Sequence, residues 1–354
     1  MPVRPARLGS IDALRGLTVA AMLLVNTPGD WAHVYAPLRH AAWHGATPTD
    51  LIFPFFLFLV GVSMAFSIGP RADAPAARPA LARALLVRAL RIALAGVLLH
   101  LLVGWLLLEG HFRLWGVLQR IALCVAVAGL LAVYLPRRLH GAAALMLLAA
   151  YSAILLQASS LAPWVNPASR LDTRLFAPWL YQWQPATGLG HDPEGLLSSL
   201  GALATTLLGL TAGRLLRDGH SGRLLLLGGA CVLVGWGGTL WLPWNKSLWT
   251  PTYALWSAGL AALLLWGSHV LVDRRGWPAL GRRFGVNAIA VYLGAAVLSV
   301  LLQASGAWAA VWTLLAARLP GHLALASLLQ ALLFVVLWWG VAVWLDRRRL
   351  YLTI

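Results

Sequence analysis

Two histidines and an aspartate lie in a short polar stretch that runs directly into a strongly apolar segment. His40, Trp43 and His44 come first, and Asp50 then opens the apolar run. Imidazole has an ordinary pKa of about 6.5, so it takes up and releases protons near neutral pH. Asp50 could accept the imidazole N–H of His40 and fix its tautomer, or it could cap the helix that begins there. His40 is therefore the first candidate for proton-transfer or acyl-transfer chemistry.

Two other polar features belong to the first apolar run of the chain. Asn26 ends that run, where an amide can donate to an oxyanion or orient a substrate. A turn residue that ends a helix before Pro28 explains Asn26 nearly as well. Asp12 and Arg15 are three residues apart on one helical face, so they form an interfacial ion pair or serve a ligand.

The composition identifies the elements that must position these groups. Of the 354 residues, 60% are apolar and only 11% are charged, and the mean hydropathy is +0.77. A water-soluble domain of this size cannot bury that much apolar surface, so we expect an all-α, polytopic membrane protein in a lipid bilayer. We expect a single domain, 1–354, with ten spans: 10–27, 49–68, 84–108, 114–135, 141–160, 195–216, 223–242, 251–272, 284–304 and 321–345.

Positive charge is distributed unevenly between the loops on the two sides of these spans. With the N-terminus inside, 18 of the 27 lysines and arginines lie at inner ends and loops, and six lie outside. This positive-inside pattern predicts that the N- and C-termini both face the cytoplasm. A net charge of +16 would suggest nucleic acid for a soluble protein, but the alternation between loops favours a membrane and no nucleic acid. The inner set is Arg4, Arg7, Arg71, Arg78, Arg83, Arg88, Arg137, Arg138, Arg214, Arg217, Arg223, Arg274, Arg275, Arg282, Arg283, Arg347, Arg348 and Arg349; the outer set is Arg39, Arg113, Arg170, Arg174, Lys246 and Arg318.

The outer loops, about 28–48 and 161–194, combine aromatic side chains with carboxylates and amides. A sugar packs its C–H face on aromatic rings while its hydroxyls need hydrogen-bond partners, so this composition suits a carbohydrate. An interfacial tryptophan belt explains most of the 19 tryptophans equally well. The polar and aromatic candidates beyond the first loop are Asp192, Glu194, Asn245, Lys246 and Trp249.

Some polar residues lie within the apolar spans themselves. Gln119 and Arg120 are several residues inside the fourth span, where they need partners or a cavity. Arginine keeps its charge and binds phosphate with two parallel hydrogen bonds, so an anionic ligand would suit such an interior. Arg91 is close enough to the basic inner loop to reach the interface, and Asn287 begins the ninth span.

Six motifs in order resemble the heparan-alpha-glucosaminide N-acetyltransferase family and its bacterial relatives. In that family a histidine at the position of His40 and an asparagine at the position of Asn26 are the catalytic pair. Trp43 and Asp50 also match, whereas His44 stands where the lysosomal enzyme has asparagine. The motifs are SIDALRGLTVAAMLLVN (10–26), HAAWHGATPTDLIFPFFLFLVG (40–61), GVLQRI (116–121), DPEGLL (192–197), NKSLWT (245–250) and GVNA (285–288).

The resemblance implies transfer of an acetyl group from cytosolic acetyl-CoA to the amine of a sugar on the far side of the membrane. Because the chain lacks the lumenal domain of the lysosomal enzyme, we expect an amino sugar or a small amino-sugar glycan as acceptor, not heparan sulfate. Catalysis is assigned to His40, Asn26 and Asp50, and no metal is expected. Acetyl-CoA binding is assigned to Arg15, Arg91, Gln119, Arg120 and Asn287. Acceptor binding is assigned to Asp12, Trp43, His44, Asp192, Glu194, Asn245, Lys246 and Trp249.

Two other functions remain open from the sequence. One is a transporter that moves a sugar or amino sugar unmodified, with charged residues inside its spans. The other is an O-acyltransferase that acts on a glycan hydroxyl. For the acetyltransferase we expect the inner (cytoplasmic) membrane of a bacterium. The sequence leaves the oligomeric state open, with a homodimer among the alternatives.

Overall fold

The structure is a computed structural model that describes residues 8–351. Arg4 and Arg7, which belong to the inner charge set, lie outside the described residues. Within residues 8–351, nine helical segments are long and apolar enough to cross a membrane. They contain α1 (Gly9–Asn26), α2 (Ile52–Ser67), α4 (Arg78–Leu107), α5 (Val117–Tyr134), α6 (His140–Leu156), α8 (Ser199–Arg217), α9 (Ser221–Gly237), α10 (Pro251–Ser268) and α14 (Leu323–Arg347).

The ninth predicted span, 284–304, is not a simple straight helix. It comprises the short α11 (Arg282–Val286) and α12 (Ala288–Ala304), and α13 (Ala307–Arg318) follows at a bend of 78°. Gly306 stands at the bend with φ of +77°, a backbone conformation that glycine adopts without strain. Counting α12 and α13 as one broken span gives ten spans, the number predicted.

The central helices approach one another closely where glycines face backbone. A Cβ atom on Gly209 of α8 would lie 2.0 Å from the carbonyl oxygen of Phe58 on α2. A Cβ atom on Gly61 of α2 would lie 1.9 Å from the carbonyl oxygen of Thr206 on α8. Small residues at such contacts let membrane helices pack backbone to backbone. The α2 and α8 helices are therefore packed backbone to backbone.

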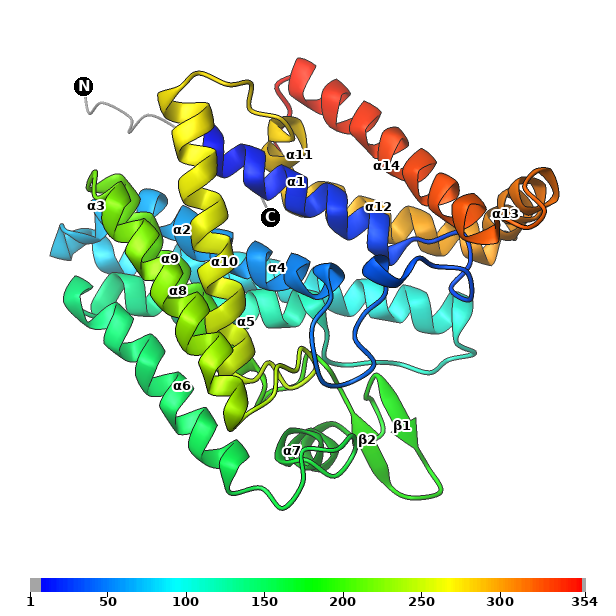
Figure 1. Cartoon of the computed structure of the whole chain (residues 1–354), viewed down its shortest axis with the longest axis horizontal. Coiled ribbons are helices and arrows are strands. Elements are labelled where there is room, and N and C mark those ends of the chain that lie inside the picture. The colour runs from blue at the N-terminus through cyan, green and yellow to red at the C-terminus, as the bar shows by residue number, and fades with distance from the viewer. Residues whose placement is uncertain (1–7, 352–354) are drawn as a thin grey trace.

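At one end of the bundle the chain forms a small cap of non-spanning structure. It contains α7 (Pro167–Phe176) and an antiparallel hairpin of β1 (Gln182–Gln184) and β2 (Leu189–His191), which lie together in Figure 1. The Trp43 indole donates a 2.9 Å hydrogen bond to the Leu161 carbonyl oxygen, so the two outer loops meet. The hairpin is a small exception to the all-α prediction. The remaining short helical turns are Ala36–Leu38, Pro48–Leu51, Gly69–Ala72 (α3), Pro75–Ala77, Arg137–Leu139, Gly238–Leu240 and the π-helical His269–Arg274.

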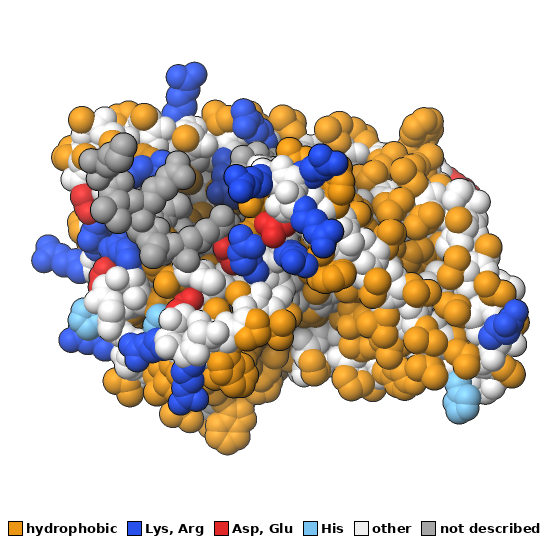
Figure 2. All heavy atoms as spheres, turned by 90° about the horizontal axis from the view of Figure 1, so that it is seen from above, with side chains coloured by type: hydrophobic (Ala, Val, Ile, Leu, Met, Phe, Trp, Pro, Cys, Tyr) orange, Lys and Arg blue, Asp and Glu red, His pale blue; other side chains and the backbone are white. Residues whose placement is uncertain are grey.

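Arginines gather at the opposite end. Arg137 forms an ion pair with Asp73, and Arg282 pairs with Asp346 at 3.2 Å, so inner-set residues from distant loops lie close to acidic partners there. Figure 2 shows many of the blue side chains in one half of that face and a broad hydrophobic surface over the other. This division suits helices surrounded by lipid with one basic rim.

Candidate active site

The loop before α2 holds His40 against Asp50. Thr47 and Asp50 form a capping box at the start of the turn Pro48–Leu51, so the aspartate does cap this helix entry. The same carboxylate lies 2.7 Å from the imidazole, Oδ1 to Nδ1. A carboxylate only accepts hydrogen bonds, so Nδ1 carries the proton and Nε2 keeps its lone pair. Both roles considered for Asp50 from the sequence are therefore present together.

Asp50 is held rigidly by backbone and side-chain donors. Its Oδ2 accepts hydrogen bonds from the backbone N–H groups of Ala41 at 3.0 Å and Thr47 at 2.9 Å. The Asp50 side chain is 1% exposed, whereas the His40 side chain is 43% exposed. The pair thus consists of a fixed, buried carboxylate and an imidazole that reaches solvent-accessible space.

His40 and Asp50 open onto a cavity of about 500 Å³ that also contains Asn26. Asn26 is the last residue of α1 and its side chain is exposed into this space. The catalytic pair implied by the family resemblance therefore shares one cavity, although the two residues come from different elements. Trp43, Glu194 and Lys246 line the same cavity.

Lys246 reaches this cavity because its segment docks on the His40 loop. The N–H of Gly45 donates to the carbonyl oxygen of Trp244 at 2.7 Å. Lys246 Nζ then lies 3.2 Å from His40 Nε2 and 3.7 Å from Asp50 Oδ1. Burial lowers the pKa of Lys246 below its ordinary value, although Glu194 and Asp50 act in the opposite direction. The amine is thus held beside the imidazole, within about equal reach of both ring nitrogens.

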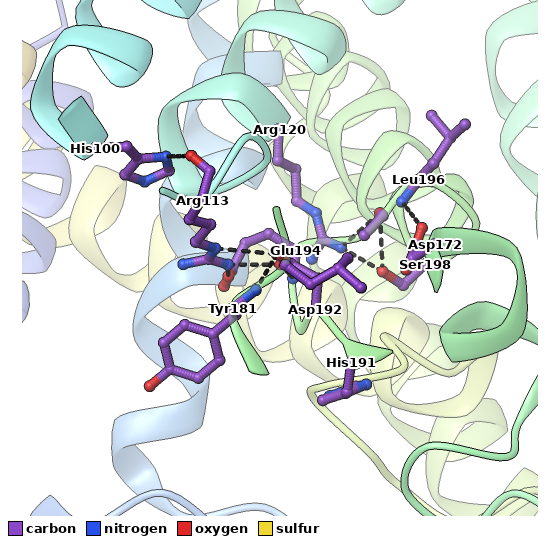
Figure 3. Close-up of polar contacts among 12 residues, drawn as sticks. His100, Arg113, Arg120, Asp172, Tyr181, His191, Asp192, Glu194, Leu196 and Ser198 are labelled. Carbon is purple, nitrogen blue, oxygen red and sulfur yellow. Dashed lines mark hydrogen bonds and ion pairs between the residues drawn. The ribbon is translucent and has the colours of Figure 1, made fainter. Parts of the chain in front are cut away.

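The segment 192–198 is fixed by two arginines that approach it from the α5 side (Figure 3). Arg113, in the loop before α5, forms ion pairs with Asp192 at 2.6 Å and with Glu194. Burial alone would lower the pKa of Arg113, but these carboxylates raise it. Burial would raise the pKa of Glu194, but Arg113 and the neighbouring cations lower it. Glu194 is therefore presented to the cavity as an anion with a fixed orientation.

Arg120 lies in the same cluster, but it does not line the cavity beside His40. It is fully buried, and its guanidinium donates to the Ser199 hydroxyl at 3.2 Å, to the Gly195 carbonyl oxygen at 3.1 Å and to the Ser198 hydroxyl. The guanidinium also lies 5.1 Å from the ring centroid of Trp249. The geometry gives Arg120 a positioning role at the start of α8. The neighbouring Gln119 is buried too, and both polar atoms of its amide lack a hydrogen-bond partner among the described residues.

A second cavity, of about 210 Å³, lies toward the arginine-rich end of the same helices. Arg15, Ser63 and Arg88 line it. Arg15 forms the predicted ion pair with Asp12 at 2.5 Å, and its Nε donates to the Gly285 carbonyl oxygen at 2.7 Å. A charged group is thus held at this cavity by one contact within α1 and one to α11.

Five other residues that were predicted to bind a substrate line neither cavity: Arg91, Asn287, Asn245, Trp249 and His44. Arg91 is exposed and lines neither, while Asn287 is buried and donates to the Leu350 carbonyl oxygen at 3.0 Å. Asn245 and Trp249 are fully buried, and they order the segment that carries Lys246. His44 lies 3.4 Å from the Asn245 amide, and burial lowers its pKa.

We call the cavity of about 500 Å³ beside His40 the outer cavity. Among its lining residues without a role assigned from the sequence, three carry a charge or a large aromatic ring with a hydroxyl: Arg113, Tyr181 and Tyr292. Arg113 was counted only as an outer charge, because the acidic residues that it pairs with are about 80 positions away along the chain. Tyr292 lies in an apolar run that carries no polar pattern. Tyr181 belongs to the aromatic outer loop, which offered the one usable signal among the three.

These features define a polytopic membrane protein with a histidine–aspartate pair and an asparagine in a cavity at one end of its helices. A family model described as "Heparan-alpha-glucosaminide N-acetyltransferase, catalytic" matches residues 7–183, half of the chain. The heparan-alpha-glucosaminide N-acetyltransferases of Mus musculus and Homo sapiens are each 24% identical to it over 82% of its length. The chain therefore belongs to the heparan-alpha-glucosaminide N-acetyltransferase catalytic family. It spans about half the length of these relatives, 54% and 53%.

Proposed function

We propose that this protein is a transmembrane N-acetyltransferase that passes an acetyl group from acetyl-CoA on the cytoplasmic side to the amine of an amino sugar, or a small amino-sugar glycan, on the periplasmic side. The observation that carries this proposal is the relation between the two cavities. His40, Asp50 and Asn26 share the outer cavity, while Arg15 and Arg88 line the second cavity on the same set of helices.

Only a short layer of protein separates the two cavities. On α2, Phe53 lines the outer cavity and Phe56 lines the inner one; on α12, Tyr292 and Ile289 are divided in the same way. The two residues of each pair are three positions apart, which is less than one helical turn and corresponds to a rise of about 5 Å along the helix axis. A long, thin substrate arm such as pantetheine can bridge this distance between helices, with its charged phosphates left at the arginine-lined end.

The chemistry follows from the fixed orientation of the imidazole. Asp50 holds Nδ1–H, so Nε2 accepts a proton from the acceptor amine as that amine attacks the thioester carbonyl. The Asn26 amide donates to the oxyanion that develops on the carbonyl oxygen, an interaction worth about 3 kcal/mol in comparable sites. A two-step route, in which Nε2 first takes the acetyl group and then delivers it, uses the same atoms.

The outer cavity also suits the acceptor. Tyr181 and Trp43 offer aromatic faces at its wall, and Glu194 offers a carboxylate to hydroxyl or ammonium groups. Arg113, whose guanidinium lies 4.6 Å from the Tyr181 ring centroid, fixes both Glu194 and the aromatic platform. These contacts support a carbohydrate that carries an amine.

The test is to incubate purified protein in detergent with labelled acetyl-CoA and glucosamine or small glucosamine glycans, and to measure labelled N-acetylated product. His40→Ala should lower turnover by about 100-fold or more, the usual contribution of general acid–base catalysis. His33→Ala is the matched control, because His33 is in the same loop and pairs with Asp30 at 2.5 Å outside the cavity. Equal turnover in the two variants would contradict the assignment of His40.

A further inference from the structure

The chain contains a single lysine. Of its 27 basic residues, 26 are arginine and one is Lys246, and that one lies in the outer cavity. Arginine keeps its proton under all ordinary conditions, whereas an ε-amine can lose its proton and become a nucleophile. The one dissociable side-chain amine of this chain is therefore located where acetyl transfer is proposed to occur.

The position of this amine relative to the proposed base is well defined. Lys246 Nζ lies 3.0 Å from His40 Nδ1 and 3.2 Å from Nε2, so it is within hydrogen-bond distance of the nitrogen that carries the lone pair. Its side chain is 20% exposed. The turn that presents it is rigid, because the Asn245 side chain accepts from the Leu248 N–H at 2.8 Å. A primary amine thus already lies within 3.2 Å of the nitrogen that is proposed to accept the proton.

The surroundings favour a reactive amine. Burial disfavours the ammonium form of Lys246 and lowers its pKa, while Glu194 and Asp50 retain part of the charge. The neutral fraction at mildly alkaline pH is consequently larger than for an exposed lysine. A lysine made nucleophilic by burial is a recurrent feature of sites that form covalent bonds to carbonyl carbons.

We propose that Lys246 is a self-acetylation site, which takes the acetyl group from acetyl-CoA when no acceptor sugar is bound. This inference rests on the proposed function. The Nζ atom attacks the thioester carbonyl, a C–N bond forms and the C–S bond breaks. The amine proton passes to His40 Nε2 and then to the departing CoA thiolate, so the products are an amide at Lys246 and free CoA.

Acetylation would change the outer cavity in two ways. It removes the positive charge that faces Asp50 and Glu194, and it adds a neutral group beside His40 within the cavity of about 500 Å³. The modified protein therefore transfers acetyl groups to an external sugar more slowly. The same geometry favours a primary amine over a hydroxyl as the natural acceptor, because the cavity already accommodates an amine next to the base.

The experiment uses the full chain, purified with a lysine-free tag, and acetyl-CoA without acceptor. Because Lys246 is the only lysine, a signal for acetyl-lysine on the intact chain reports this residue alone, and peptide mass spectrometry separates it from the N-terminal amine. We expect modification that approaches one acetyl group per chain. In His40→Ala its rate should fall by about 100-fold.

Arg174→Lys is the internal reference for spontaneous acetylation. Arg174 is exposed on α7 and lies outside the cavity, so the lysine introduced there reports the uncatalysed reaction in the same molecule. Acetylation of Lys246 no faster than at this reference, or equally fast in His40→Ala, would overturn the proposal. Product from glucosamine together with unmodified Lys246 would overturn the self-acetylation alone, whereas neither product would also overturn the proposed function.

Discussion

Replacing Asp50 by asparagine tests how His40 is held as a base. Asp50 Oδ2 accepts from two backbone N–H groups, Ala41 and Thr47, and asparagine can keep an oxygen there. Its NH₂ group then faces His40 Nδ1 in place of Oδ1. Two donors cannot face each other at 2.7 Å, so Nδ1 gives up its proton and the proton moves to Nε2. The imidazole then has no lone pair toward the acceptor amine.

The size of the expected loss follows from the contact that disappears. A hydrogen bond to a charged group contributes about 1.5–3 kcal/mol. At about 1.4 kcal/mol per factor of ten, this corresponds to a loss of about 10- to 150-fold, and losing the base itself costs about 100-fold or more. We therefore expect Asp50→Asn to lower kcat by at least about 100-fold. KM for both substrates should change little, because the tautomer change acts on the chemical step.

The assay compares Asp50→Asn with Asp30→Asn in the labelled acetyl-CoA reaction. Asp30 pairs with His33 at 2.5 Å in the same loop, but neither residue lines the cavity, so this second variant should keep activity within about twofold. Thermal unfolding in detergent confirms that both variants are folded. Retention of more than about a tenth of wild-type kcat by Asp50→Asn would refute the tautomer argument.

Three further predictions concern the second cavity, where acetyl-CoA is proposed to bind, the small cap that contains α7, and the membrane topology. Arg15→Gln should raise KM for acetyl-CoA about tenfold, whereas Arg91→Gln, which alters an exposed residue outside both cavities, should not; equal effects would contradict the donor assignment. Burial raises the pKa of Asp172 from 3.8 to about 7, so the stability that this carboxyl contributes is full below pH 3.8 and is lost by about pH 7, up to about 4 kcal/mol. Asp172→Asn should therefore reduce the difference in Tm between pH 5 and pH 8. An unchanged difference would contradict the raised pKa of Asp172. An impermeant thiol reagent outside right-side-out vesicles should label Tyr35→Cys and not Arg138→Cys, and the reverse pattern would invert the topology.

Local sequence patterns predicted most of the spans and the central contact of the site. Continuous apolar runs define the helices, although α4 begins at Arg78, six residues before the predicted boundary. His40 and Asp50 are ten residues apart in one loop, so their contact could be inferred from proximity along the chain. The i,i+3 pair of Asp12 and Arg15 was predictable for the same reason.

Contacts between distant segments were not predictable in this way. Arg113 meets Asp192 across 79 positions, and Lys246 meets His40 across 206. No periodicity links such residues, since their proximity depends on how several helices pack. Arg120 shows the same difficulty, because a polar residue in an apolar run predicts a buried partner or a cavity and cannot distinguish them. The structure gives it partners in the segment 195–199.

The most direct test of the account is acetyl transfer in sealed vesicles of known orientation. With acetyl-CoA only on the cytoplasmic side and amino sugar only on the other side, we expect N-acetylated sugar to accumulate on the side of the sugar. The reverse arrangement should give no product, because the arginine-lined cavity faces the cytoplasm in the predicted topology. Product from the reverse arrangement alone, or delivery of unmodified sugar across the membrane without acetyl-CoA, would contradict the account.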